Sequence, residues 1–258
     1  MKYNRIIMFC DYGLDDAIAT LHILRHAHMF THIDIVPIGG NVGVDIAYRN
    51  AHTLVKAADA DRSKVRIVDA RNIQQAAANI FDIHGCDGMG DMLEPSESDI
   101  AVIGFDEFKK ELDRAGLPAK DCVLSLGPCT VPDMLGYVPF STVLMGGTVE
   151  ESPNCGDYEF NEAMDVPAFK RFAYKATAVA TLDTCHDRKF GFEHYKTGDP
   201  LADGLIDKYV ALCKSRNAPI AIYDLVAAFA VTNPERFDVQ RVLRPDGVEF
   251  NLLLLEKK

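Results

Sequence analysis

Residues 5–19 read RIIMFCDYGLDDAIA: an apolar run, an acidic turn that contains glycine, and then a new apolar periodicity. The pattern predicts a buried strand, a tight loop and the N-terminus of a helix. In an open α/β sheet, ligands bind just beyond the carboxyl ends of the strands. Asp11, Asp15 and Asp16 are therefore expected in a binding crevice. Gly13 allows a turn sharp enough for Asp11 and Asp16 to face one point.

These three carboxylates form a candidate cation site. Clustered carboxylates repel one another and resist ionising together unless a cation joins them. A set of oxygen ligands suits a hard cation such as Ca²⁺ or Mg²⁺. The plainer alternative is an aspartate that caps the helix beside solvated acidic neighbours. The position of all three at the end of the first strand favours the metal site.

Composition narrows the class of protein. The chain has 258 residues, 48% of them apolar, and a formal net charge of −11. This length fits a single domain over residues 1–258. No stretch is long enough to cross a bilayer, so no membrane partner is expected. The negative charge argues against nucleic acid as a partner and fits a neutral or cationic ligand or a bound metal. Seven cysteines without a C-x-x-C pair indicate reduced thiols in a cytoplasmic protein.

Strand-like and helix-like segments alternate along the chain. The alternation predicts an α/β fold with a mostly parallel open sheet and helices on both faces. Strands are expected at about residues 5–10, 33–38, 65–68, 122–126, 142–145 and 176–182. Helices are expected at about residues 15–29, 45–60, 105–115, 201–215 and 223–231, and another begins near residue 165. The tail 237–255 alternates around the turn Pro245-Asp246-Gly247, which indicates a C-terminal hairpin.

Three further polar positions follow predicted strands or open helices. Asn41 stands in a glycine-rich turn after the second strand, where an amide offers both a donor and an acceptor. His84 stands in a second glycine-rich loop and either contacts a ligand, caps the loop or is solvated. Asp224 begins a predicted helix, where it is either a ligand-side carboxylate or only a cap.

Taken together, the motifs resemble the nucleoside hydrolase family, the inosine–uridine type of ribohydrolase. That family opens with Asp-x-Asp-Pro-Gly-x-Asp-Asp, and this chain has Phe9-Cys10-Asp11-Tyr12-Gly13-Leu14-Asp15-Asp16. Further matches follow in order: Gly40-Asn41, Asn50-Ala51, His84-Gly85, Leu126-Gly127-Pro128-Cys129-Thr130, Met145-Gly146-Gly147, Glu159-Phe160-Asn161 with Asp165, Tyr223-Asp224 and Asn233-Pro234-Glu235.

The resemblance implies a site for one Ca²⁺ ion and a ribose pocket beside it. The implied metal ligands are Asp11, Asp16, the Thr130 carbonyl and Asp224. The implied ribose contacts are Asp15, Asn41, Asn154, Glu159 and Asn161. The resemblance also implies a homo-oligomer and a small-molecule nucleoside or riboside as substrate.

The chain departs from the family motif at three positions. Phe9 replaces the first aspartate, at a position expected to support Asp11. Tyr12 replaces proline, which predicts a less rigid loop. Tyr223 replaces the histidine that protonates the leaving base in some members. The chain also lacks tryptophan, so stacking on a base would require Phe or Tyr.

The residues and the resemblance predict a Ca²⁺-dependent nucleoside ribohydrolase. Breaking an N-ribosidic bond builds positive charge on the sugar, which a carboxylate-rich pocket stabilises. Asp11 is the predicted general base toward water, and Tyr223 or His84 is the predicted acid toward the leaving base. The alternative is a non-catalytic ribose- or nucleoside-binding protein that keeps the metal cage. A haloacid-dehalogenase-type phosphatase ranks last, because its nucleophile would have to be Phe9.

Overall fold

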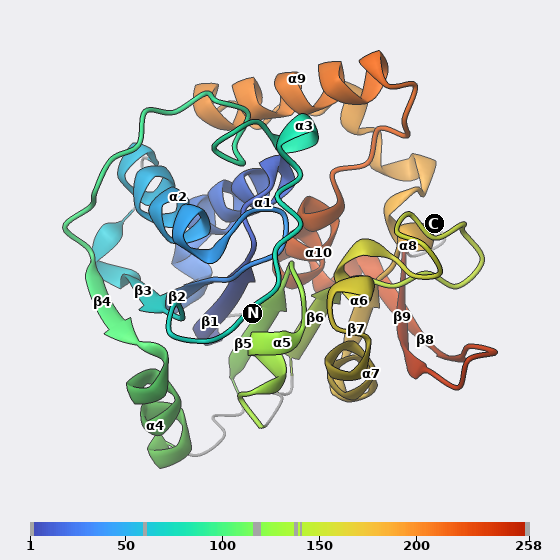
Figure 1. Cartoon of the computed structure of the whole chain (residues 1–258), viewed down its shortest axis with the longest axis horizontal. Coiled ribbons are helices and arrows are strands. Elements are labelled where there is room, and N and C mark those ends of the chain that lie inside the picture. The colour runs from blue at the N-terminus through green and yellow to red at the C-terminus, as the bar shows by residue number, and fades with distance from the viewer. Residues whose placement is uncertain (1–2, 59–60, 116–119, 137–138, 140, 256–258) are drawn as a thin grey trace.

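The computed structural model describes residues 3–58, 61–115, 120–136, 139 and 141–255. In this part of the chain, nine strands form one sheet in the order β4-β3-β2-β1-β5-β6-β7-β9-β8 (Figure 1). The strands are β1 (Tyr3–Cys10), β2 (Phe30–Pro37), β3 (Val65–Asp69), β4 (Ala101–Gly104), β5 (Asp121–Ser125), β6 (Ser141–Met145), β7 (Ala178–Ala180), β8 (Phe237–Leu243) and β9 (Glu249–Leu255).

The sheet is parallel except at one edge, where β8 and β9 pair antiparallel. Strand β1 lies between β2 and β5, and Ile6 pairs with Ile33 on one side and Cys122 on the other. Because they are parallel, the strands that lead into the acidic loop and the glycine-rich loops have their carboxyl ends on the same side of the molecule. The expected mostly parallel sheet and the expected C-terminal hairpin are both confirmed.

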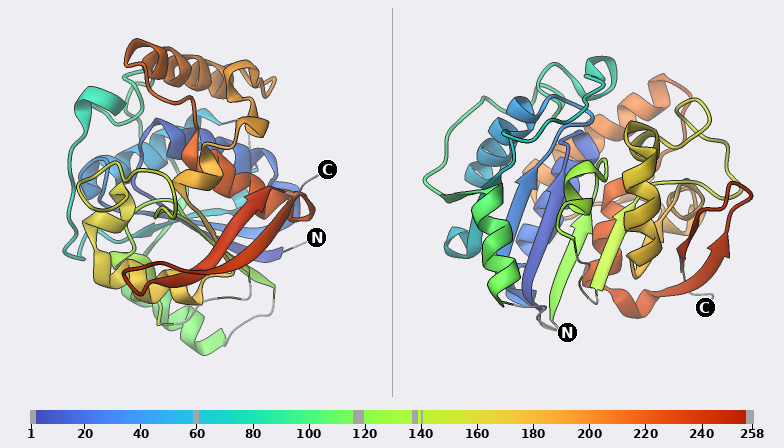
Figure 2. Two further views of the ribbon diagram at one scale, coloured as in Figure 1. Left: turned by 90° about the vertical axis from the view of Figure 1, so that its right-hand side faces the viewer. Right: turned by 60° about the horizontal axis from the view of Figure 1, so that its bottom comes forward.

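Helices cover both faces of the sheet, as the sequence predicts (Figure 2). They are α1 (Leu14–Arg25), α2 (Val44–Ala57), α3 (Phe81–His84), α4 (Phe105–Ala115), α5 (Thr130–Asp133), α6 (Phe160–Met164), α7 (Val166–Lys175), α8 (Leu182–Cys185), α9 (Pro200–Ser215) and α10 (Tyr223–Thr232). Helices α1, α2, α9 and α10 contribute to the core on one face, and α4, α5 and α7 to the core on the other.

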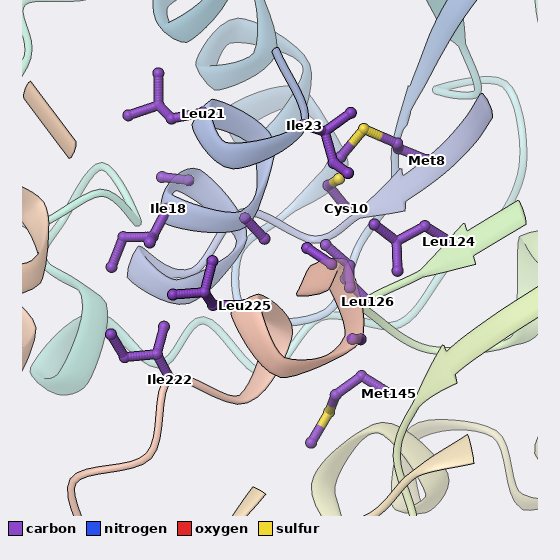
Figure 3. Packing of buried hydrophobic residues seen from close by; sticks show 14 of the residues in the cluster. Met8, Cys10, Ile18, Leu21, Ile23, Leu124, Leu126, Met145, Ile222 and Leu225 are labelled. Atoms are coloured by element: carbon purple, nitrogen blue, oxygen red, sulfur yellow. The ribbon is translucent and has the colours of Figure 1, made fainter. Parts of the chain in front are cut away.

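Strand β1 serves both cores because its side chains alternate between the two faces of the sheet. Met8 and Cys10 point to the core shared with α1 and α10, whereas Phe9 packs in the opposite core. Figure 3 shows side chains of α1 and α10, among them Ile18 and Leu225, packed beside those of β1 and β5. Buried on both sides, β1 holds the start of the acidic loop in a fixed place.

The structure differs from the predicted elements in a few places. Strand β4 was not expected, because it is short and largely exposed and lacks an alternating apolar pattern. Helix α1 ends at Arg25 and gives way to a 3₁₀ turn, whereas the sequence predicts helix to residue 29. Helix α2 ends at Ala57, and residues 59 and 60 of the predicted helix lie outside the described residues. No helix in the described ranges is long and apolar enough to span a membrane.

Candidate active site

The loops after β1, β2, β5 and β6 meet around a cavity of about 270 Å³. Its wall also includes residues of α3, α9 and α10, which close it from the side. Eight of the residues singled out in the sequence line it: Asp15, Asn41, His84, Asn154, Glu159, Asn161, Tyr223 and Asp224. Residues up to 209 positions apart are thus brought to one cavity, as the topology of a parallel sheet allows.

Three buried carboxylates meet beside this cavity. One oxygen atom from each of Asp15, Asp16 and Asp224 lies within 4.8 Å of the others. The three side chains are at most 7% exposed, and Oδ1 of Asp15 has no hydrogen-bond partner. A buried carboxylate oxygen without a partner is costly unless a cation or a donor satisfies it. The donor set is oxygen only, so the three residues fit a hard divalent cation.

The electrostatics of the three carboxylates support the same interpretation. Burial raises the pKa of Asp16 well above its usual range, and the charges of Asp11 and Asp15 raise it further. Burial likewise raises the pKa of Asp224, with added repulsion from Asp16 and Asp15. Carboxylates in this position ionise together only when positive charge accompanies them. Any cation at this site would be bound with release of protons.

Asp11 begins the acidic loop but is not among the three residues whose oxygens meet. Its Oδ2 accepts the backbone N–H of Asn41 at 2.8 Å, and its Oδ1 accepts Nδ2 of Asn41 at 3.1 Å. Gly40 and Gly127 approach it so closely that a Cβ on either would lie 2.8 Å or less from a carboxylate atom of Asp11. Burial raises the pKa of Asp11 to about 7.

Asp16 fixes the acidic loop to the start of α1. Its Oδ1 accepts the backbone N–H of Asp11 at 3.1 Å, and its Oδ2 accepts that of Gly13 at 2.8 Å. Tyr12, between them, has φ 50° and a fully buried side chain in the core. Proline could not adopt that φ. Core packing of the Tyr12 side chain thus anchors the loop. The replacement of the family's proline by tyrosine had predicted a less rigid loop.

Thr130, whose carbonyl is a predicted metal ligand, is the first residue of α5. Its hydroxyl donates to Oδ2 of Asp165 at 2.8 Å. Asp165 in turn caps α7 by accepting the N–H of Ala168. This pair ties the loop after β5 to the segment that carries Glu159 and Asn161. The role of the Thr130 carbonyl stays a prediction.

The predicted ribose contacts beyond the acidic loop lie on one short segment. Oε2 of Glu159 accepts the N–H groups of Gly147 at 2.9 Å and Glu162 at 3.1 Å. Nδ2 of Asn161 donates to the Leu126 carbonyl at 2.9 Å, and Oδ1 of Asn154 accepts the Phe160 N–H at 2.8 Å. Burial raises the pKa of Glu159 to about 7.

The two candidate acids, His84 and Tyr223, differ in their hydrogen bonds. Nδ1 of His84 accepts the backbone N–H of Leu14 at 3.1 Å, which fits a neutral ring with its proton on Nε2. The Tyr223 hydroxyl lies 3.1 Å from Nε2 of His186. Burial raises the pKa of Tyr223 above its usual range.

Sequence reasoning missed His186 and an ion pair behind the site. The guanidinium of Arg244 bonds both carboxylate oxygens of Glu162, which is fully buried one residue after Asn161. His186 belongs to no motif, and Arg244 lies in the alternating tail, whose pattern predicts a hairpin but not the partner of this side chain. One signal was available in the sequence for the ion pair. Glu162 lies directly after Asn161, and a carboxylate buried there needs a positively charged side chain as its partner.

The comparisons with known proteins place these observations in a family. A family model described as "Inosine-uridine preferring nucleoside hydrolase" matches residues 6–248. No curated protein sequence matches the chain.

Several solved structures share the fold. A purine-preferring ribonucleoside hydrolase from Gardnerella vaginalis has a TM-score of 0.71 at 17% identity, covering 98% of this chain and 93% of that one. An inosine-guanosine nucleoside hydrolase has a TM-score of 0.71 at 19% identity, covering 98% and 88%. An inosine-uridine preferring nucleoside hydrolase from Bacillus anthracis has a TM-score of 0.62 at 15% identity, covering 98% and 95%. At these identities the likeness shows the fold.

Proposed function

We propose that this chain, which belongs to the inosine-uridine preferring nucleoside hydrolase family, hydrolyses the N-glycosidic bond of a ribonucleoside. The products would be ribose and the free base. The observation that carries the proposal is the convergence of Asp15, Asp16 and Asp224 beside a cavity whose wall also holds amides, a glutamate, a histidine, an arginine, tyrosines and apolar side chains. Such a cavity suits a sugar next to a cation, with an apolar end for a base.

A single Ca²⁺ ion is the proposed cofactor. Asp16 and Asp224 would hold it with their carboxylates, and the Asp11 carboxylate and Thr130 carbonyl are the further proposed ligands. When bound, such an ion supplies positive charge that lowers the pKa of a coordinated water. The unpartnered Oδ1 of Asp15 supports a cation or a substrate hydroxyl at this point.

The ribose is proposed to lie between the acidic loop and the segment 154–161. Asp15 and Asn41 face the cavity from one side, and Asn154, Glu159 and Asn161 from the other. Because the backbone contacts of Glu159 and Asn161 fix both side chains, the sugar would be held in one orientation. Glu159 would stabilise the positive charge that develops on the sugar as the bond to the base breaks.

Asp11 is the proposed general base. Its carboxylate would lie beside the ion and the water that the ion coordinates, where a carboxylate can take a proton from that water. Both of its oxygens already accept bonds from Asn41, and each has a second lone pair, so that one oxygen can face the ion and the other the attacking water. Asn41 therefore orients the base as well as contacting the sugar.

The experiment that tests the proposal measures ribose and base release from inosine, uridine, cytidine and 4-nitrophenyl riboside with Ca²⁺ supplied. Turnover that is lost with a chelator and restored by Ca²⁺ is the expected result. The competing proposal, a non-catalytic ribose- or nucleoside-binding protein, predicts tight ribose binding with no turnover of any of these compounds. No specific feature of the cavity favours it.

A further inference from the structure

We propose that His186 supplies, through the hydroxyl of Tyr223, the proton that the departing base takes up. Glu151, His186 and Tyr223 then act as one hydrogen-bonded chain that ends at the cavity. This inference rests on the proposed hydrolase function and adds the source of the proton. His186 acts through Tyr223 and is a positioning residue for the reaction, whereas Tyr223 is the group placed to touch the base.

The geometry of the chain of contacts is continuous. Nε2 of His186 lies 3.1 Å from the Tyr223 hydroxyl oxygen, and Nδ1 lies 3.5 Å from Oε2 of Glu151. Each ring nitrogen therefore faces one partner: a carboxylate on one side and a phenol on the other. In the proposed relay both ring nitrogens carry a proton, with Nδ1–H toward Glu151 and Nε2–H toward the phenol oxygen. The phenol then keeps its own proton for the cavity side.

The surrounding structure holds the chain in place. His186 directly follows α8, and Tyr223 is the first residue of α10. The carboxylate of Asp183, on α8, accepts the backbone N–H groups of Val149, Glu150 and Glu151 at 2.7–2.9 Å. The loop that carries Glu151 is thus fastened to the same short helix that presents His186. This arrangement holds Glu151 and His186 in a fixed position relative to each other.

The contact between His186 and Tyr223 joins two cavities. Tyr223 lines the cavity proposed to bind the nucleoside, and His186 lines a second one of about 310 Å³ with Cys185, Phe190 and Pro219. The His186 side chain is 19% exposed and the Glu151 side chain 47% exposed. Protons from solvent can therefore reach the imidazole without passing the substrate.

The relay removes a difficulty that each candidate acid has alone. A lone phenol at position 223 would be left as a buried phenolate after giving up its proton, and burial disfavours a charged group. His84 has its Nδ1 occupied as an acceptor, so protonating its ring would break the bond from Leu14. With His186 behind it, the phenol regains a proton as it loses one.

The step balances as follows. The C1′–N bond breaks, and its electron pair stays on the base nitrogen. That nitrogen takes the proton of the Tyr223 hydroxyl, and the phenol oxygen takes the Nε2 proton of His186. His186 is left neutral, with its remaining proton on Nδ1 toward Glu151. Water adds its oxygen to C1′ and gives one proton to Asp11. Asp11 then releases that proton to solvent, and His186 recovers one from solvent.

The first test compares leaving groups in the variant His186→Gln. Glutamine keeps a hydrogen-bond donor for Tyr223 but is not an acid at neutral pH. We expect kcat on inosine or uridine to fall on the order of 10²-fold, within the usual range for general acid catalysis. Turnover of 4-nitrophenyl riboside, whose leaving group needs no acid, should stay within about threefold. Equal losses on both substrates would overturn the relay.

Two controls separate the relay from a structural role. His194→Gln makes the same change at an exposed histidine and should leave both substrates unaffected. Adding His186→Gln to Tyr223→Phe should cause no further loss on the nucleoside, because both changes interrupt one chain. If the losses in kcat from the two changes multiplied in the double variant, the relay would be contradicted. Melting temperature and bound Ca²⁺ of each variant show that the fold and the cation site are intact.

Chemical rescue gives the second test. His186→Ala extends the second cavity up to Tyr223, and added imidazole should restore nucleoside turnover at least tenfold without changing 4-nitrophenyl riboside turnover. Failure of rescue, in a variant that melts like the parent, counts against proton supply by His186. If the parent protein turns over no riboside at all, the hydrolase proposal itself fails, and the relay fails with it.

Discussion

Arg244 and Glu162 form a two-point ion pair behind the proposed ribose segment, with N–O distances of 2.7 and 2.5 Å. The Glu162 side chain is fully buried, and the Arg244 side chain is 9% exposed. Arg244 also donates to the Thr148 carbonyl, so the hairpin β8–β9 is fastened both to the loop before Glu159 and to α6 after it. The pair is the main polar contact between this hairpin and the proposed site among the described residues.

Arg244→Met should destabilise the protein by about 3–5 kcal/mol, because it leaves a buried carboxylate without its partner. It should also raise KM for the riboside more than it lowers kcat, since the displaced segment is the one proposed to bind the sugar. Urea unfolding and steady-state kinetics measure the two effects. Arg241→Met is the matched control: Arg241 pairs with Glu249 on the same hairpin, but both are exposed, and about 1 kcal/mol or less is expected. Equal destabilisation by the two changes would contradict this account.

Ca²⁺ should stabilise the parent protein against heat, by about 2.7 kcal/mol when the ion is at 100 times its Kd. Asp224→Asn should abolish most of that gain, because Asp224 is a proposed ligand of the ion and an amide lacks the negative charge of the carboxylate. Thermal melting with chelator and with added Ca²⁺ measures the difference. Asp238→Asn, an exposed change on β8, should keep the full response. A parent protein whose melting ignores Ca²⁺ would refute the metal assignment.

Asp11→Asn should lower turnover on the order of 10²–10⁴-fold, because an amide does not take a proton from water. The new amide also faces the two donors of Asn41, so we expect some loss of stability as well. Asp15→Asn should instead raise KM and lower kcat together while Ca²⁺ still binds. Steady-state kinetics with 4-nitrophenyl riboside and the metal content of each variant distinguish a general-base role for Asp11 from a sugar-binding role for Asp15. Near-parental turnover of Asp11→Asn at saturating Ca²⁺ would exclude Asp11 as the base.

Glu159 should make stability depend on pH between about 4.5 and 7. Its pKa is raised by burial to about 7, so the folded protein binds a proton that the unfolded chain has already lost in this range. The stabilising contribution is therefore full below pH 4.5 and is lost as pH rises through 7. Unfolding of the parent and of Glu159→Gln in chelator should show a difference that changes by about 3 kcal/mol over the range. A difference that stays constant with pH would contradict the raised pKa.

The sequence predicted the parts of the fold that local pattern governs. The apolar run before Asp11, the glycine-rich strand ends and the turn at residues 245–247 all carry their own signal, and the sheet and hairpin followed from them. Strand β4 also has a short apolar run, Ile100 to Ile103, but the strand is only four residues long and largely exposed, and it was not predicted.

The candidate site divides in the same way. Asp15, Asp16 and Asp224 could be identified as candidate site residues because each carboxylate follows a predicted strand or begins a predicted helix, where ligands bind in this class of fold. His186 and Arg244 were not, since their importance depends on Tyr223 and Glu162, which are distant in sequence. Which of Asp11 and Asp15 lies nearer the other carboxylates depends on side-chain directions within one turn, and residue spacing does not determine those.

The separation of Arg244 from Glu162 has a consequence for the order of events during protein synthesis. The two residues are 82 positions apart, so at roughly 5–20 residues per second a ribosome needs about 4–16 s to go from one to the other. Throughout that interval the nascent chain carries Glu162 with its partner still unmade. The strands before Glu162 can already pair, yet the segment proposed to hold the sugar still lacks the Arg244 guanidinium that anchors it. During synthesis the chain should therefore form the first strands of its sheet before it can form the proposed substrate site.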